Sequence, residues 1–309
     1  MPSQLRQEQS HTKVGNNPAR LYQRALRWLI TPYLIGVLLL VIIPAALSFF
    51  LAFNDYDALA APSWVGLKNF KDLLTIDEIF PIAIRNSLLY AALSVPMRVL
   101  GALALALLFQ QRRRGVGVYR IAVYLPTVIP DVAYALVWLW IFNPIYGPLN
   151  QLLAVVGIQG PAWLVKGDSA LLAIVIMSVF QLGEGFVVLL AGLNDIPGDY
   201  YEAAKVDGGG GWATFRYITF PLIRPWLMLL TLRDITLSVQ NSFTPAYLMT
   251  GGGPYYATTF LPLMMYEEAF DRFRFGVGSA IMVFVVLGIL VILFLVYRLL
   301  RGWGYSDGF

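Results

Sequence analysis

The sequence predicts an all-α fold, a polytopic membrane bundle of about six transmembrane helices. Of its 309 residues, 58% are hydrophobic and 13% are charged, and the mean hydropathy is +0.67. A soluble domain carries about 25% charged residues, so most of the surface of this chain is expected to face lipid. The apolar runs are long and continuous, as spanning helices require, unlike the short alternating segments of a β-barrel.

Six apolar segments approach the roughly 20 residues that a helix needs to cross a bilayer. They lie near Leu29–Phe50, Ser87–Phe109, Ile121–Phe142, Ala170–Leu193, Trp226–Leu248 and Val277–Tyr297. We therefore expect a polar N-terminal tail (1–27), a transmembrane domain (28–302) and a short C-terminal tail (303–309). No small-residue cleavage signature follows the first segment, so removal of a signal peptide is not expected.

Lysine and arginine residues outside these segments are unevenly distributed. With the N-terminus inside, fourteen fall in inside segments and six in outside segments. Cytoplasmic loops carry the excess of Lys and Arg, so both termini are expected in the cytoplasm. The net charge of +4 and the pI near 9.2 are then explained by the basic residues of the cytoplasmic loops. Membrane lipid is an expected partner and nucleic acid is not.

The connecting segments carry local signals of their own. In the first outside loop, Leu67, Phe70, Leu73 and Leu74 have the spacing of a short amphipathic helix on the membrane surface. Residues 112–115, Arg-Arg-Arg-Gly, predict a tight inside turn, and glycine and proline between 143 and 161 predict turns in an outside loop. The chain has no cysteine, which excludes disulfides and thiol chemistry.

The inside loop of residues 194–225 predicts two short helices. Asn194 or Asp195 is expected to cap the first of them, which runs from Gly198 to Val206. Gly208 is placed to end that helix in a left-handed conformation that a side chain disfavours. A second helix over residues 212–217 is expected to continue into the fifth span.

This loop resembles the EAA loop of inner-membrane permease subunits of ATP-binding-cassette importers. Glu-Ala-Ala, three residues, Gly, nine residues and Ile-x-Leu-Pro is the family pattern, and only Phe220 departs from it, in place of Leu. The resemblance implies a type I importer permease (MetI-like) fold in a bacterial or archaeal inner membrane. The residues it implies for coupling to the ATPase are Glu202, Ala203, Ala204, Asp207 and Gly208.

The same resemblance implies partners and a division of labour. A second homologous permease, an ATP-binding-cassette ATPase dimer and an extracytoplasmic solute-binding protein are expected. ATP and Mg²⁺ belong to the ATPase, so this chain is expected to be no enzyme and to hold no cofactor or metal. In agreement, it contains no Gly-x4-Gly-Lys-Ser/Thr loop and no His/Cys metal cluster.

Further stretches resemble carbohydrate-uptake permeases of the maltose-transporter type, closest to the MalF-like member of the permease pair. The matching stretches are Leu125-Pro126-Thr127, residues 138–147, Thr250–Pro254 and Phe275–Ala280. The likeness covers roughly residues 29–300. It implies that the cargo is a sugar, an oligosaccharide or a glycerol-phosphate-like solute.

Charged residues inside the predicted spans require an explanation, because each costs at least about 2.5–3.5 kcal/mol at the bilayer centre. One interpretation is a hydrated substrate pathway formed by Arg98, Gln181, Glu184, Arg233, Asp234, Gln240 and Asn241, with aromatic walls from Trp138, Trp140, Phe180 and Tyr247. The other is a pair of structural ion pairs, Arg98 with Glu184 and Arg233 with Asp131. Sequence alone leaves both open.

Two other functions remain as alternatives. Asp55 and Asp57 in the first outside loop have the spacing to share a divalent ion, as in a polytopic lipid-linked glycosyltransferase. A secondary transporter driven by an ion gradient is the other. Neither alternative explains the EAA spacing.

Overall fold

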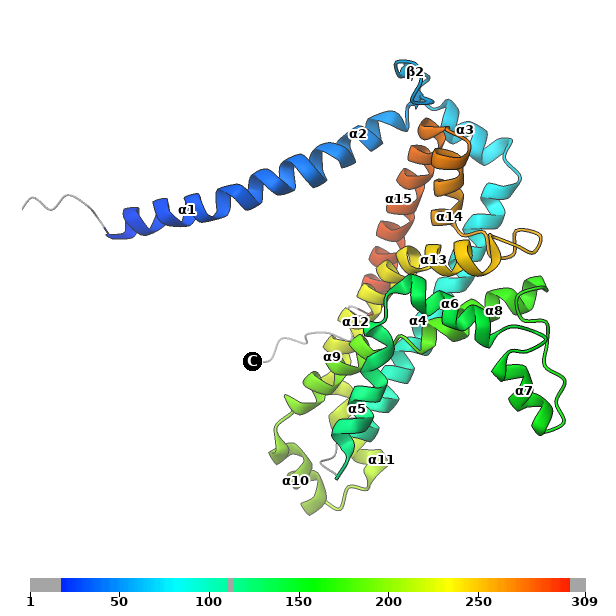
Figure 1. Ribbon diagram of the computed structural model, residues 1–309. Coiled ribbons are helices and arrows are strands. Elements are labelled where there is room, and N and C mark those ends of the chain that lie inside the picture. The colour runs from blue at the N-terminus through cyan, green and yellow to red at the C-terminus, as the bar shows by residue number, and fades with distance from the viewer. Residues whose placement is uncertain (1–17, 111–113, 301–309) are drawn as a thin grey trace, which may run out of the picture. The chain divides into compact units, whose positions relative to one another are not determined.

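The computed structural model describes residues 18–110 and 114–300, and the chain divides into two units, Met1–Phe50 and Leu51–Phe309 (Figure 1). Residues 1–17 of the predicted N-terminal tail lie outside the described residues, as do the last two residues of the predicted transmembrane domain (301–302) and the whole predicted C-terminal tail (303–309). So do Arg112 and Arg113 of the predicted inside turn.

The first unit contains one apolar helical segment. It comprises α1 (Pro18–Val37), a π-helical turn η1 (Leu38–Ile42) and α2 (Ile43–Leu51). The 26 residues Leu26–Leu51 are long and apolar enough to cross a membrane, and none of this window is buried. The predicted span Leu29–Phe50 falls within this segment, and the helix starts at Pro18, inside the predicted tail. A helix that is apolar on all sides needs lipid or protein around it.

The second unit is almost entirely helical. Among residues 51–110 and 114–300, the one β element is a pair of two-residue antiparallel strands, β1 (Asn54–Asp55) and β2 (Ser63–Trp64), which an all-α prediction does not include. The helices before the inside loop are α3 (Lys68–Thr75), α4 (Ile79–Phe109), α5 (Val116–Tyr124), η2 (Leu125–Val128), α6 (Asp131–Ile141), α7 (Pro148–Val155), α8 (Gly167–Val179) and α9 (Gly183–Asn194). Those of the loop and after it are α10 (Gly198–Val206), α11 (Gly211–Thr214), η3 (Phe215–Thr219), α12 (Phe220–Asn241), α13 (Phe243–Pro245), η4 (Ala246–Thr250), α14 (Leu261–Tyr266), η5 (Glu267–Asp271) and α15 (Phe275–Leu300).

The helices account for five to six membrane crossings. Within the described residues, Leu26–Leu51, α4 and α15 are each long and apolar enough to span, and two bent helix pairs raise the number to five. The remaining predicted span corresponds to α12, which has 22 residues. This helix carries three charged residues, Arg224, Arg233 and Asp234, so its length and composition alone do not identify it as a membrane span.

Two of the predicted spans are broken rather than straight. Val116–Val128 and Asp131–Ile141 meet at a bend of 102°, and Gly167–Val179 and Gly183–Asn194 at 43°. Pro130 causes the first break, since a residue before proline is driven out of the helical region, and Ile129 has an extended ψ of 130°. At the second break, a Cβ on Gly183 would lie 2.8 Å from the Val123 carbonyl oxygen, so only glycine allows this approach.

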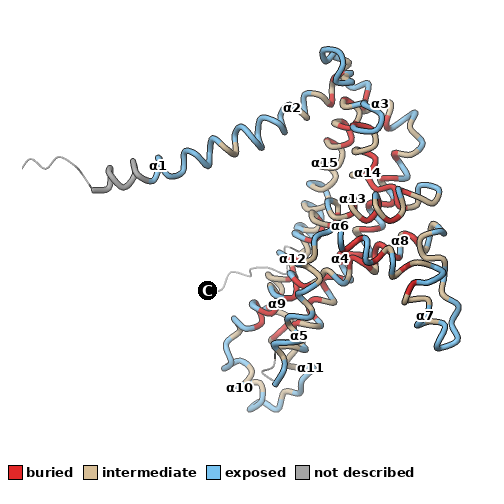
Figure 2. The backbone as a smooth tube through the Cα atoms, in the orientation of Figure 1, coloured by how far each residue is buried: buried red, intermediate tan, exposed pale blue. Residues whose placement is uncertain are grey.

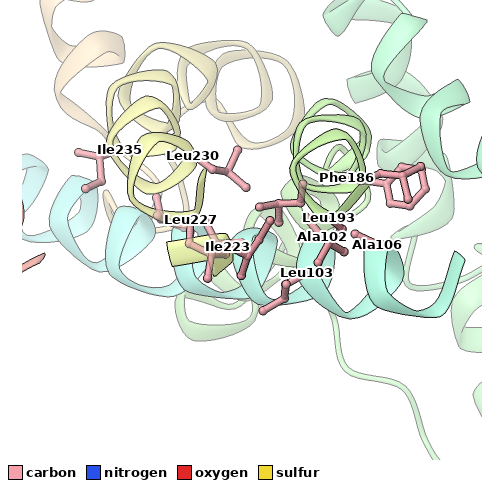
Figure 3. Packing of buried hydrophobic residues seen from close by; sticks show 13 residues of the cluster. Ala102, Leu103, Ala106, Phe186, Leu193, Ile223, Leu227, Leu230 and Ile235 are labelled. Atoms are coloured by element: carbon pink, nitrogen blue, oxygen red, sulfur yellow. The ribbon is translucent and has the colours of Figure 1, made fainter. Parts of the chain in front are cut away.

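The largest group of buried side chains joins three helices, the long α4 together with α9 and α12 (Figure 3). It comprises Val95, Val99, Ala102, Leu103 and Ala106 of α4, Phe186, Leu189, Leu190 and Leu193 of α9, and Ile223, Leu227, Leu230 and Ile235 of α12. Small residues on α4 let α9 approach closely, as is typical of membrane helices. Buried residues concentrate along these helices, whereas α10 has none (Figure 2). This packing places α4, α9 and α12 side by side.

A second buried group lies where α3 and α15 meet the first turns of α4. The predicted amphipathic helix is confirmed as α3, with Leu73 buried in this group. Its Asn69 is also buried and donates to the carbonyl oxygens of Ala52 (3.0 Å) and Asn54 (2.9 Å). These bonds attach the short β1 strand to the helical bundle.

Candidate functional site

A polar cavity of about 130 Å³ lies between α4, α12, the break before α6 and the start of α9. Its walls are formed by Arg98, Thr127, Asp131, Gln181, Glu184, Arg233, Asp234, Leu237 and Asn241. Six of the seven residues that the sequence proposed for a substrate pathway therefore line one space. The seventh, Gln240, is exposed and does not line this cavity.

Arg98 and Asp234 form the buried side of the cavity. The Arg98 Nε atom lies 3.2 Å from an Asp234 carboxylate oxygen, and their side chains are only 6% and 10% exposed. A second nitrogen of Arg98 donates to the backbone carbonyl of Asp234 at 3.3 Å. Because a buried charge without a partner is strongly unfavourable, this pair holds α4 against α12.

Arg233 and Glu184 form the open side. Their side chains make an ion pair and are 41% and 50% exposed, respectively. Arg233 also approaches the Asp234 carboxylate to 3.6 Å, so it connects the open pair to the buried one. Exposed pairs of this kind contribute about 0–1 kcal/mol to stability. Their side chains are therefore free to exchange partners with a bound solute at little cost to the fold.

The observed ion pairs differ from those that the sequence suggested. Arg98 pairs with Asp234 rather than Glu184, and Arg233 pairs with Glu184 rather than Asp131. Arg233 and Asp234 are consecutive, so they project from α12 about 100° apart, and only the packing decides which one faces α4. Asp131 contributes to the cavity wall from the first turn of α6.

Aromatic walls are not found at this cavity. Of the four proposed rings, none is among its lining residues in the described chain. Trp138 is instead buried in the group around α6, with ring contacts to Tyr134, Phe142 and Phe180. Sequence reasoning also missed Thr127 and Leu237. Proline at positions 126 and 130 was the available signal for Thr127, because it breaks the helix there.

The loop of residues 194–225 forms the helix that the sequence predicted. The helix α10 runs from Gly198 to Val206, and Gly208 follows it with φ of +76°. The Gly208 N–H donates to the Lys205 carbonyl (3.1 Å) and the Gly209 N–H to the Ala204 carbonyl (2.7 Å). The predicted cap is wrong, because Asn194 and Asp195 end α9 and the helix α10 starts directly after Pro197.

The proposed coupling residues lie on an accessible surface. Glu202, Ala203, Asp207 and Gly208 are exposed and Ala204 is half-buried. Within this unit, α10 and α11 lie at the end opposite to α3 and β2 (Figures 1 and 2). The surface is therefore available to another protein chain.

The loop is joined to the helix that carries the cavity. The predicted second helix is found as α11 followed by the π-helical η3, which continues directly into α12. The Tyr201 hydroxyl of α10 lies 3.3 Å from the Thr219 hydroxyl of η3. The helix α10 thus contacts η3, which continues into α12, the helix that bears Arg233 and Asp234.

Asp57, one of the two aspartates in the loop predicted to lie outside, has a local role. The Asp57 carboxylate accepts hydrogen bonds from the backbone N–H groups of Ala60 (3.1 Å) and Leu59 (3.0 Å), which lower the pKa of Asp57. Across residues 18–110 and 114–300, no group of three His, Cys, Asp or Glu side chains is placed to hold a metal ion. The glycosyltransferase interpretation gains no support from this loop.

Comparison with known proteins gives a consistent picture. Residues 99–303 match the family described as "Binding-protein-dependent transport system inner membrane component". The chain is 37% identical over 270 residues to the probable ABC transporter permease protein YesP of Bacillus subtilis (strain 168), covering 85% of this chain and 87% of that protein. It is 34% identical to the trehalose/maltose transport system permease protein MalF of Thermococcus litoralis, covering 82% and 85%.

The fold also matches a solved structure. A chain of a bacterial ABC transporter involved in the import of the acidic polysaccharide alginate superposes with a TM-score of 0.79 at 23% identity, covering 93% of this chain and all of that one. The similarity supports the fold alone at this level of identity.

Proposed function

The chain belongs to the family of binding-protein-dependent transport system inner membrane components, and from this premise we propose that it carries a sugar across the membrane. It is a multi-pass permease of an ATP-binding-cassette importer in the inner membrane, a non-catalytic component without a cofactor. The family assignment leaves the secondary transporter and the glycosyltransferase without support. The nature of the cargo and the roles of individual residues are the proposal.

The proposed cargo is a sugar or a related solute, delivered by an extracytoplasmic binding protein. A related permease of 34% identity serves trehalose and maltose. The cavity offers guanidinium donors beside carboxylate and amide acceptors, a mixture suited to neutral hydroxyl groups. We propose Arg98, Gln181, Glu184, Arg233, Asp234 and Asn241 as the polar pathway, with Gln240 beside it.

In this proposal, a separate ATPase dimer supplies the energy for transport. A second homologous permease would complete the pathway, and an ATPase dimer would contact Glu202, Ala203, Ala204, Asp207 and Gly208. With both termini cytoplasmic, α10 faces that ATPase. The observation that carries this proposal is the connection from α10 through Tyr201, Thr219 and η3 to α12, because it joins an exposed docking helix to the polar cavity.

Reconstitution tests the proposal directly. The chain would be purified with its partner permease and ATPase, placed in lipid vesicles with the cognate binding protein, and supplied with a panel of labelled sugars. ATP-dependent accumulation of a sugar supports the proposal. Accumulation without ATP, or of no sugar in the panel while another solute is imported, contradicts it.

Replacing Glu184 with alanine is expected to raise the apparent KM for uptake roughly tenfold, the effect of losing one charged hydrogen bond of about 1.5 kcal/mol. Assembly and thermal stability are expected to be unchanged, because the pair with Arg233 is half exposed. Uptake and the yield of the purified complex are the measurements.

The matched control is Glu78→Ala, an exposed glutamate just before α4 and outside the cavity. It should leave both uptake and assembly unchanged. If Glu184→Ala prevents association with the partner permease, Glu184 is a structural residue and does not belong to the substrate pathway.

A further inference from the structure

The segment between α6 and α8, residues 143–165, carries an apolar surface that the bundle does not cover. It contains α7, which lies at the margin of the unit beyond α8 (Figure 1) and has no buried residue. Six large aliphatic side chains of the segment are exposed, here called the aliphatic patch: Ile145, Leu152, Val155, Val156, Ile158 and Val165. The most exposed of them, Ile145 and Val155, are each 84% exposed.

The composition of the segment is not that of a loop in water. Glycine and proline predict turns here, yet residues 132–165 contain no Asp, Glu, Lys, Arg or His, and charge returns only at Lys166. The loop of residues 52–78, by contrast, carries seven charged residues. A loop surrounded by water has no physical reason to exclude charge, whereas contact with lipid makes charge costly.

An asparagine joins the two sides of the segment from within. The Asn150 side chain donates hydrogen bonds to the carbonyl oxygens of Pro144 (3.1 Å) and Pro161 (3.2 Å). Its own oxygen accepts a hydrogen bond from the Trp163 indole N–H at 2.7 Å. A Cβ on Gly160 would lie 2.0 Å from that oxygen, so glycine is needed for this close approach. The segment is therefore a compact unit with its polar groups turned inward.

Two further polar side chains also bond within the segment. The Asn143 oxygen accepts hydrogen bonds from the backbone N–H groups of Ile145 (3.0 Å) and Tyr146 (3.1 Å). Gln151 donates to the Tyr146 carbonyl oxygen at 3.2 Å. Polar groups that face lipid must find their partners inside the protein. These bonds meet that condition and leave the aliphatic patch as the outward surface.

The aliphatic patch continues an apolar face of a membrane-crossing segment. On α6, about half of each of four side chains is exposed, and their spacing of three to five residues places them on one face: Val132, Leu136, Val137 and Trp140. This helix belongs to a bent pair that is apolar enough to cross a membrane. Ile145 follows the last residue of α6 by four positions. The lipid-facing surface of this crossing thus extends onto the segment.

The topology places the segment in one leaflet. The chain crosses through α5 and α6 and returns through α8 and α9 to α10, so α7 lies on the side of the membrane away from α10. With eight residues, α7 is about 12 Å long, less than half of a hydrocarbon core about 30 Å thick. It therefore cannot cross and must turn back on the same side.

The chemistry of the aliphatic patch distinguishes lipid from a protein partner. Protein interfaces are enriched in Tyr, Trp, Phe, Met and Arg, whereas the patch consists only of Leu, Ile and Val. The same surface left in water would promote aggregation. Tyr146 and Trp163, at the two sides of the segment, are residue types that concentrate at the level of the lipid headgroups.

We propose that α7 and its flanking turns lie in the membrane leaflet away from α10, with the aliphatic patch in contact with lipid acyl chains. An interfacial helix buries its apolar face about 5–10 Å deep, at the boundary of headgroups and acyl chains. The lipid then holds the end of α6, whose first residue, Asp131, lines the polar cavity. The inference does not depend on the nature of the cargo.

The test measures the surroundings of single labelled positions in the complete transporter in lipid vesicles. The chain has no cysteine, so Val155→Cys and Val165→Cys each give it one site for an environment-sensitive fluorophore. The matched control is Leu59→Cys, because Leu59 is also aliphatic, is 92% exposed and lies in the charged loop of residues 52–78. Cysteine-free partner chains are used, and co-purification with them confirms assembly. Brominated lipids quench a label among acyl chains, and iodide quenches a label in water.

The labels at positions 155 and 165 are expected to lose emission in brominated vesicles and to resist iodide. The label at position 59 is expected to respond in the opposite way. Iodide quenching at position 155 as strong as at position 59 overturns the inference, since the segment would then be an aqueous loop. A label at 155 that neither quencher reaches overturns it as well, because another protein chain would then cover α7. Each of these outcomes leaves the proposed function intact, which fails only if no sugar is imported.

Discussion

Replacing Gly208 with valine is expected to impair ATP-driven uptake strongly while the permease still assembles in the membrane. Gly208 has φ of +76°, which costs a residue with a Cβ about 1–2 kcal/mol and is least tolerated by a β-branched side chain. The chain would leave this conformation and lose the two hydrogen bonds that end α10. Uptake is expected to fall at least about tenfold, while the basal ATPase activity persists.

The control for this variant is Gly210→Val. Gly210 lies in the same loop and also has open space around the position of a Cβ, but its φ is −72° and its ψ is 168°, which suit valine. Uptake and ATP hydrolysis would be measured together in reconstituted vesicles. If Gly208→Val transports as well as Gly210→Val, the end of α10 is not part of the coupling path.

Replacing Asp234 with alanine is expected to cause the largest loss of stability. The change leaves Arg98 buried without its carboxylate partner, since both side chains are at most 10% exposed. Breaking a buried ion pair in this way costs about 3–5 kcal/mol, which is a large part of the total stability of about 5–15 kcal/mol that a typical domain has. Thermal unfolding of the purified complex is the measurement.

A double variant separates charge from packing. Arg98→Met with Asp234→Leu removes both charges and keeps apolar volume between α4 and α12, so stability is expected to return to near the parent value. Glu184→Ala, at the exposed pair, should unfold like the parent. If the double variant is as unstable as Asp234→Ala, the buried charge is not the cause of the loss.

Features that depend on local spacing could be predicted from the sequence. The extent of α10 and the left-handed Gly208 follow from residues within one short segment. The collection of Arg98, Glu184, Arg233 and Asp234 around one cavity was also predictable. Their high cost in lipid requires them to meet in the interior of the bundle.

Features that depend on packing could not be predicted. Which of two consecutive residues, Arg233 or Asp234, meets Arg98 depends on the rotation of α12 about its axis, and sequence does not specify it. The cap of α10 could not be predicted either, because Asn194 and Asp195 form the C-terminal end of α9 instead. The short β1–β2 pair was missed because two residues show no alternating pattern.

The bend of 102° within the third crossing has a consequence for how the protein enters the membrane. Residues 116–128 form a rod of about 20 Å, too short for a hydrocarbon core about 30 Å thick. Open backbone at such depth is tolerated only against protein or beside water, and Thr127 and Asp131 place the break at the polar cavity. We therefore expect this crossing to become stable in the membrane only after α9 and α12, which follow it in the sequence, cover the break.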